Sequence, residues 1–340
     1  MAASPKLPMI SGSVQQQYHM YHAAAYILNV ELQHPIKLPL QEYGHVVLEH
    51  TRRQSLITQS VGETNIEGLI SFKSGHTRVA GAHVQQKTDV FGNDHAGWLT
   101  LATAALEGYN VEDIITADRV VAQLSTQHSM TNNPAQPISH VPRVQFLGTR
   151  FENLRVGGYP VEVELDLAFC GSQPKDDRSY LQDGSFLDRV RRQLDGIVET
   201  RDLPKSLEKK YGAEIAYIDD LKKRAKDKRS EAGANGDPNS YSKLRCSLVK
   251  KINLPVDIPG VRTFGNAIFI RDFGTVYLAE VEVGVNNSRS DFRHRKSDPP
   301  QTPSSESNYF TLKMLNMHLG CPSGGNPSGP GVSGNGQTQP

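Results

Sequence analysis

The sequence predicts a mainly β protein: an antiparallel sandwich or a barrel-like sheet domain that carries a helical insertion and has disordered termini. Three observations lead to this fold class. Residues 116–169 follow a strand, turn, strand, turn, strand order, with glycine at the turns. Residues 161–169 alternate strictly between apolar and acidic side chains. From Ser185 onward the apolar residues recur at helical spacing instead.

The alternating segment is the clearest single element of the chain. Its acidic positions are Glu162, Glu164 and Asp166, and its apolar positions are Val161, Val163, Leu165, Leu167 and Phe169. Because successive side chains of a strand point to opposite faces, we expect the apolar set to be buried and the acids to face water.

Earlier strands are predicted from short apolar runs bounded by glycine and proline. They cover residues 24–32, 45–50, 68–73, 77–86 and 98–106. The link Ser74-Gly75-His76 is short and contains glycine, which favours a hairpin between the third and fourth of these strands.

A helical insertion is predicted at 172–240. Its first helix covers 185–198, with Ser185 as N-cap and an apolar face made of Phe186, Leu187, Val190, Leu194 and Ile197. A second helix is expected over 213–229, because the cations at its end suit the negative pole of the helix dipole. The residues that follow are rich in Gly, Asn and Asp, as in a linker.

Strands are predicted again after the insertion, at 244–254, 267–271 and 275–285. Residues 309–319 fit either a strand or a short helix. The domain prediction is therefore a flexible lead at 1–12, one β-rich domain at 13–321 and a disordered tail at 322–340. The tail is assigned to disorder because it consists largely of Pro, Ser, Gly and Asn without periodicity.

Composition excludes several function classes. The net charge of +1 gives no electrostatic preference for nucleic acid, and no apolar run is long enough for a membrane helix. The three cysteines have neither disulfide-framework nor zinc-knuckle spacing. We see no apolar leader segment, so the expected location is the cytoplasm, with export by a non-Sec route as the alternative.

The candidate catalytic residues are three acids, Asp118, Glu162 and Glu164, which could act as acid–base groups across a cleft. The competing interpretation is that these acids, like Glu280 and Glu282, form the solvated faces of half-buried strands. No pattern predicts a cofactor or a metal site, and the histidines form no HxH or HExxH motif. Cys246 follows Arg245 and is a further candidate nucleophile, although adjacent strand residues face apart.

Residues 115–120 and 151–161 together carry a resemblance. The strand Ile-Thr-Ala-Asp followed by Asn-Leu-Arg-Val-Gly-Gly-Tyr-Pro-Val resembles a block in bacterial β-rich proteins of unassigned function, some of which are choice-of-anchor-like surface proteins. The resemblance covers residues 98–167. It implies a β-rich fold and transfers no catalytic residue.

The leading functional hypothesis is a non-enzymatic binding or assembly protein of unknown ligand, which acts through a sheet face or self-associates through sheet edges. The alternative is an enzyme that acts on a small molecule or glycan in a β-lined pocket by carboxylate and histidine chemistry. An enclosed pocket lined by titratable groups would favour the enzyme.

Overall fold

The computed structural model of the chain describes most of its residues. The described ranges are 18–51, 53–88, 94–129, 141–175, 178–226, 242–286, 307–320 and 324–339. The lead predicted at 1–12 lies outside them.

Within these ranges the strands form two ten-stranded antiparallel sheets and one two-stranded sheet. Sheet A contains β1 (Tyr18–Tyr26), β2 (Leu28–Leu32), β3 (Leu38–Tyr43), β4 (Val46–Thr51), β16 (Ser242–Ser247), β18 (Val261–Phe264), β19 (Ala267–Ile270), β20 (Gly274–Asn286), β21 (Ser307–Leu319) and β22 (Ser328–Gln339). Sheet B contains β5 (Ser55–Val61), β6 (Thr64–Ile66), β7 (Ile70–Phe72), β8 (Ser74–Thr88), β9 (Asp94–Val111), β10 (Ile115–Ser129), β11 (Arg143–Gln145), β12 (Arg150–Glu152), β13 (Arg155–Val156) and β14 (Tyr159–Pro160). The small sheet pairs β15 (Glu162–Leu165) with β17 (Val249–Asn253).

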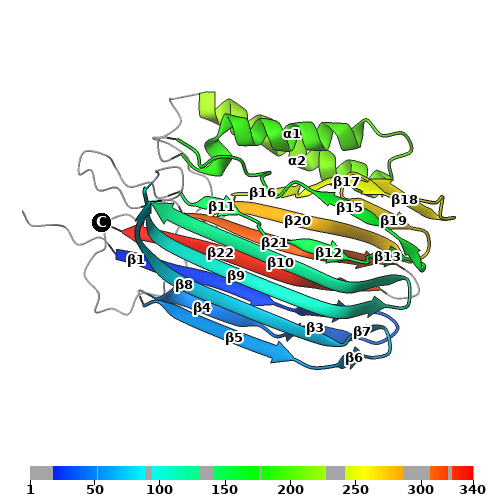
Figure 1. The fold of residues 1–340 in the computed structure, drawn as a ribbon. Helices are drawn as coiled ribbons and strands as arrows, with labels where there is room; N and C mark the ends of the chain where they lie inside the picture. The colour runs from blue at the N-terminus through cyan, green and yellow to red at the C-terminus, as the bar shows by residue number, and fades with distance from the viewer. Residues whose placement is uncertain are drawn as a thin grey trace, which may run out of the picture.

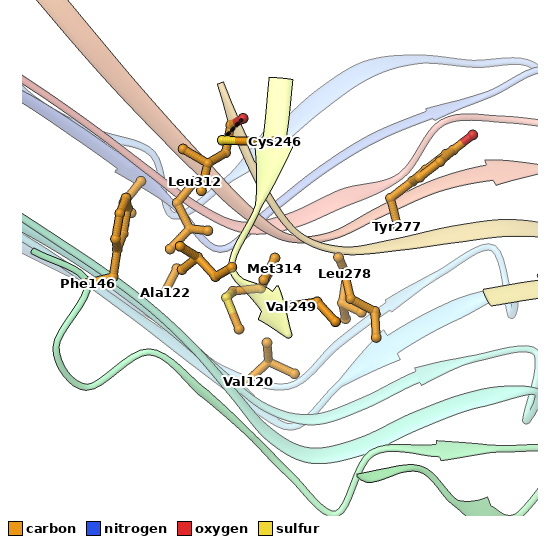
Figure 2. Close-up of a cluster of buried hydrophobic side chains, with 14 of the residues drawn as sticks. Val120, Ala122, Phe146, Cys246, Val249, Tyr277, Leu278, Leu312 and Met314 are labelled. Carbon is orange, nitrogen blue, oxygen red and sulfur yellow. Dashed lines mark hydrogen bonds between the residues drawn. The ribbon is translucent and has the colours of Figure 1, made fainter. Parts of the chain in front are cut away.

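Sheets A and B pack face to face as a sandwich, which confirms the predicted fold class (Figure 1). Figure 2 shows the core between them, where Val120 and Ala122 of β10 lie near Leu312 and Met314 of β21. All four of these side chains are buried. The apolar inner faces of the long strands therefore supply the main hydrophobic stabilisation.

The helical insertion covers part of the outer face of sheet A (Figure 1). It contains the 3-10 turn η1 (Tyr180–Gln182) and the helices α1 (Gly184–Val198) and α2 (Lys205–Lys226). The apolar face predicted for the first helix is buried throughout. The N-cap is Asp183 rather than Ser185, because the Asp183 carboxylate accepts a hydrogen bond from the Phe186 amide at 3.0 Å. Neither helix of the described residues has the length and apolarity to cross a bilayer.

The prediction of a disordered tail at 322–340 is wrong for its strand-forming part. β22 lies inside sheet A, where it pairs with β1 on one side and β21 on the other. Its glycines allow close packing, since a Cβ at Gly331 would come within 2.2 Å of the Tyr26 ring. Glycine-rich composition predicts disorder, but here two neighbouring strands satisfy the backbone of a segment with few apolar side chains.

The hairpin predicted around Gly75 is also wrong. β7 and β8 do not pair with each other, and both pair with β9. Gly75 lies within β8, where a Cβ would come within 2.5 Å of the Ile27 side chain. This glycine therefore allows close packing between the sheets instead of making a turn.

The alternating segment at 161–169 is strand only at β15. Val161 and Phe169 are buried, whereas Val163 and Leu165 are partly buried against the core. After Leu165 the chain turns, with the Ala168 amide donating to the Asp166 carboxylate at 3.1 Å. The predicted division into apolar and wet faces is thus confirmed for the strand, over a shorter length.

Two histidines lie between the sheets at one end of the sandwich. His19 of β1 and His128 of β10 are both buried, with ring centroids 4.8 Å apart. The His19 ring also stacks on Trp98, at 5.3 Å between centroids. Burial, and then the nearby His128, lower the pKa of His19 from 6.5 to about 2. His19 is therefore neutral throughout the physiological pH range.

This pair predicts a loss of stability in mild acid. His19 of the unfolded chain takes up a proton near pH 6.5, whereas the folded protein does so only near pH 2. The contribution of neutral His19 to the free energy of unfolding is therefore complete above pH 6.5 and falls by about 1.4 kcal/mol per pH unit below it. Chemical denaturation from pH 7 to pH 5 should show a loss of about 2 kcal/mol that His19→Phe removes. An equal slope in both proteins would refute this assignment.

Candidate functional site

The three predicted acids lie on open surface. Asp118 of β10 is exposed and accepts a hydrogen bond from the Asn153 side chain at 2.6 Å. Glu164 of β15 is exposed and pairs with Lys250 at 2.5 Å, and Glu162 is exposed on the same strand. Asp118 belongs to sheet B and the two glutamates to the small sheet. The structure therefore does not bring the three together around a cleft.

A polar groove that the sequence did not predict lies on the outer face of sheet A. Its volume is about 220 Å³. The lining residues come from α2, β16, β20 and β21, and they are Lys210, Arg245, Glu280, Glu282, Thr311, Lys313, Asn316 and His318. We call this feature the sheet A groove.

Strand register explains how these side chains converge. In the pairing of β20 with β21, Glu280 is opposite Lys313 and Glu282 is opposite Thr311. β20 is irregular at Ala279, which has a φ of 45°. Glu280 and Glu282 then project from the outer face, while the intervening Val281 is fully buried. α2 lies beside this face and supplies Lys210.

Glu280 is the most buried acid of the groove, at 8 % exposure. Its carboxylate accepts hydrogen bonds from Lys210 Nζ at 2.9 Å and Asn316 Nδ2 at 2.7 Å. Burial alone would raise its pKa, but the Lys210 charge and these two hydrogen bonds hold the pKa of Glu280 below its usual value. Glu280 is thus an ionised, buried carboxylate. The prediction that it lies on a solvated strand face is wrong, because α2 covers it.

Lys210 is itself held in place from a second direction. Its Nζ lies 3.4 Å from the centroid of the Tyr277 ring, a cation–π geometry. Burial, and then the Glu280 charge, raise the pKa of Tyr277 to about 12. The Tyr277 ring also packs edge-on against His318, with 5.3 Å between centroids. Lys210 and Glu280, which line the groove, therefore form a packed polar unit with Tyr277.

The second acid of the groove is neutralised by β16. Glu282 pairs with Lys243 at 2.9 Å and with Arg245 at 3.7 Å. Arg245 also pairs with Glu214 of α2 at 3.4 Å. Burial raises the pKa of the Glu214 carboxyl. These contacts tie the insertion to the edge of sheet A and leave neither Arg245 nor Glu282 without a counter-charge.

Lys313 differs from the other cations of the groove. Although it is opposite Glu280 in the register, it makes no ion pair within 4.0 Å among the described residues. His318 is kept from adding positive charge, because burial, followed by the Lys210 charge, lowers its pKa. In and beside the groove, Lys210, Lys243, Arg245 and Lys313 thus outnumber Glu214, Glu280 and Glu282. The local charge balance is positive.

Cys246 does not support nucleophilic chemistry. Its side chain is buried, and its Sγ lies 3.7 Å from the Val281 carbonyl, to which the thiol donates (Figure 2). Burial raises the pKa of this thiol well above its usual value, so the reactive thiolate is suppressed. Cys170 is buried likewise, and burial raises its pKa to about 12. Cys321 lies outside the described residues.

A second hollow, of about 370 Å³, lies beside β18 and β19. An ion pair between Arg262 and Asp202, at 3.6 Å, lines this hollow, and both of its side chains are exposed. No group of three His, Cys, Asp or Glu side chains in the described ranges is arranged to hold a metal ion. The sheet A groove is therefore the better candidate site, because it combines a cavity with buried charge.

Comparison with known families gives one match. A family model described as "Domain of unknown function (DUF8256)" matches residues 19–284. That span includes the helical insertion and nearly all of β20, whereas β21 and β22 lie beyond it. No curated protein and no solved structure matches the chain.

Proposed function

We propose that this protein, which belongs to the DUF8256 family, binds a small anionic molecule in the sheet A groove. The family description names no activity, so the proposal is based on the groove alone. The observation that carries the proposal is Lys313, a cation that lines the cavity without a carboxylate partner among the described residues. A bound anion would complete the charge balance that the protein groups leave open.

The surrounding groups favour a carboxylate or phosphate oxygen. Lys313 supplies ammonium donors, and Asn316 and Thr311 add neutral hydrogen-bonding groups on the same strand. Glu280 does not compete for Lys313, because it is already engaged with Lys210 and Asn316. The framework is preorganised, since its acids and the remaining cations are held by the ion pairs described above.

The size of the groove limits the ligand. Pockets for drug-sized ligands span about 300–1,000 Å³, whereas the sheet A groove measures about 220 Å³. A compact anion fits this volume better than an extended chain does. This volume supports a binding protein whose ligand is a compact anion held in the sheet A groove.

A second candidate function is acid–base catalysis on a small molecule or glycan. One observation favours it: His318, whose pKa is lowered by burial, lines the same groove as the ionised Glu280. A neutral imidazole beside a carboxylate is a usable acid–base pair. Binding ranks first, because Glu280 is committed to Lys210 and Asn316.

We also propose a cytoplasmic location for the protein. The free, buried thiols of Cys170 and Cys246 suit a reducing compartment, which supports the cytoplasm. The resemblance to bacterial choice-of-anchor-like proteins stays a prediction.

The binding proposal predicts the effect of Lys313→Gln. Isothermal titration with inorganic phosphate, and separately with acetate, should give saturable binding to the wild-type protein. Removing this cation of the groove, which has no ion-pair partner among the described residues, should weaken that binding at least about tenfold, which corresponds to about 1.4 kcal/mol.

The matched control is Lys251→Gln, which removes an exposed lysine from β17 on the small sheet. It changes net charge equally and should leave the dissociation constant unchanged. Equal weakening by both variants would indicate a diffuse charge effect and would contradict a site at Lys313. His318→Ala separates the two functions, since it should preserve phosphate binding and abolish only a catalytic turnover.

A further inference from the structure

We propose that the hollow beside β18 and β19 is a second ligand site, which takes a small zwitterion with an aromatic side chain, such as a free aromatic α-amino acid. We call this feature the β18–β19 hollow. Its volume of about 370 Å³ lies within the range of about 300–1,000 Å³ that small-molecule sites span. It shares no lining residue with the sheet A groove, so either proposal can fail without the other.

Two parts of the chain that are distant in sequence form the walls of the β18–β19 hollow. One wall is the connection between α1 and α2, which supplies Asp202 and Pro204, and the other is the β18–β19 hairpin. Figure 1 shows both at the same end of the molecule. Arg262 of β18 pairs with Asp202 at 3.6 Å. This ion pair joins the two walls, and it gives Arg262 a counter-charge.

The apolar surface of the hollow comes from the hairpin and the segment before it. Phe264 and Ile258 are buried, whereas Phe269 of β19 is only partly buried against the core. Phe269 is opposite Arg262 in the register of the two strands, so both lie on the same face of the hairpin. A phenyl ring that lines a hollow and keeps part of its surface exposed offers a stacking partner for a second aromatic ring.

Arg271 is a cation of the hollow that lacks a counter-charge. It follows β19 directly, and its amide donates to the Gly260 carbonyl at 2.8 Å, which extends the pairing of the hairpin by one residue. Gly260 has a φ of 82°, and a Cβ there would come within 3.3 Å of the Arg271 Cβ. Arg271 is exposed and forms no ion pair within 4.0 Å among the described residues. Its planar guanidinium can therefore bind a ligand carboxylate through two parallel hydrogen bonds.

Asp257 supplies a charge of the opposite sign. It is exposed, and in the described part of the chain it too forms no ion pair within 4.0 Å. Asp257 and Arg271 thus line one hollow without neutralising each other. A simple anion would be attracted to Arg271 but repelled by Asp257. A zwitterion suits both, with its carboxylate at Arg271, its ammonium group at Asp257 and its aromatic ring on Phe269.

Isothermal titration of the full chain with L-phenylalanine tests the proposal. Three further probes each lack one feature of this ligand: phenylacetate has no ammonium group, phenethylamine has no carboxylate, and L-alanine has no ring. Phenylalanine should bind saturably, and each of the other three should bind at least about tenfold more weakly. This series uses the wild-type protein, so it tests the ligand class even if a variant fails to fold.

Two substitutions locate the site. Arg271→Gln and Asp257→Asn should each weaken phenylalanine binding at least about tenfold, and both should melt like the wild-type protein because the two side chains are exposed. The matched control is Arg143→Gln, at an exposed position on β11 of sheet B, which should bind phenylalanine unchanged.

The proposal would be overturned if phenylalanine gave no saturable binding, or if Arg271→Gln bound it as tightly as the wild-type protein does. It would also be overturned if any of the three incomplete probes bound as tightly as phenylalanine, because the ligand would then not need both charges and a ring. None of these results would bear on phosphate binding at Lys313, which belongs to the sheet A groove.

Discussion

Removing residues 328–340 is expected to abolish cooperative folding. The deletion takes away β22, which lies between β1 and β21 and contacts both β9 and β10 of the opposite sheet. Its loss would separate the N-terminal strands of sheet A from β20 and β21, and would expose the inner face of sheet B. Circular dichroism melting should show no cooperative transition, or the truncated protein should be insoluble.

A single substitution within β22 tests the burial of this strand without shortening the chain. Val332→Asp would bury a charge at a position that is 1 % exposed, and it should destabilise severely. Ser333→Ala, on a partly exposed neighbouring residue, should change little. If the truncated protein melted within about 5 °C of the full chain, β22 would not be an integral strand of the sandwich.

Lys210→Met is expected to cost about 2–4 kcal/mol of stability at neutral pH. The substitution keeps the aliphatic part of the side chain but removes the cation that faces Glu280 at 2.9 Å. Glu280 is 8 % exposed, and Asn316 alone cannot compensate a buried carboxylate. Breaking a buried ion pair from one side costs more than the pair itself contributes. Urea denaturation at pH 7 measures the difference.

The pH dependence of this difference has a definite sign. The pKa of Glu280 is lowered in the folded protein, so its pairing contributes stability above the usual carboxyl pKa and loses it as the pH falls through the lowered value. The difference in the free energy of unfolding between the wild-type protein and Lys210→Met should therefore become smaller in acid. Lys209→Met, an exposed neighbour on α2, is the control and should be neutral. A gap of the same size for both variants would contradict a specific role for Lys210.

Local patterns predicted much of the fold. The period change after residue 184 and the spacing of Phe186, Val190 and Leu194 predicted the first helix and its buried face, because a helix presents one apolar stripe. The alternation around Val163 predicted a strand with one wet face. These features depend on neighbours within a few residues, which a sequence displays directly.

Long-range pairing was the part that local patterns did not contain. β22 is poor in apolar side chains, and it is ordered because β1 and β21 satisfy its backbone on both sides. The local pattern at Gly75 predicts a turn, whereas in the structure this glycine makes room for the Ile27 side chain. In both cases the decisive partner is distant in sequence.

The candidate site was missed for the same reason. Glu280 and Glu282 have the same alternating pattern as Glu162 and Glu164, and both pairs were expected to be solvated. α2 covers only the first pair, and Lys210 then makes Glu280 a buried, ionised group. An acid-rich strand alone gave no signal of that covering helix.

The central claim is that the sheet A groove binds a small anion through Lys313. The most direct measurement is a nuclear magnetic resonance titration of the full chain with inorganic phosphate, against sodium chloride at matched ionic strength. We predict saturable shifts of the Lys313, Asn316 and His318 signals, with β5 unaffected. The claim would be contradicted if the signals of Lys313, Asn316 and His318 did not shift. It would also be contradicted if exposed lysines such as Lys251 shifted equally.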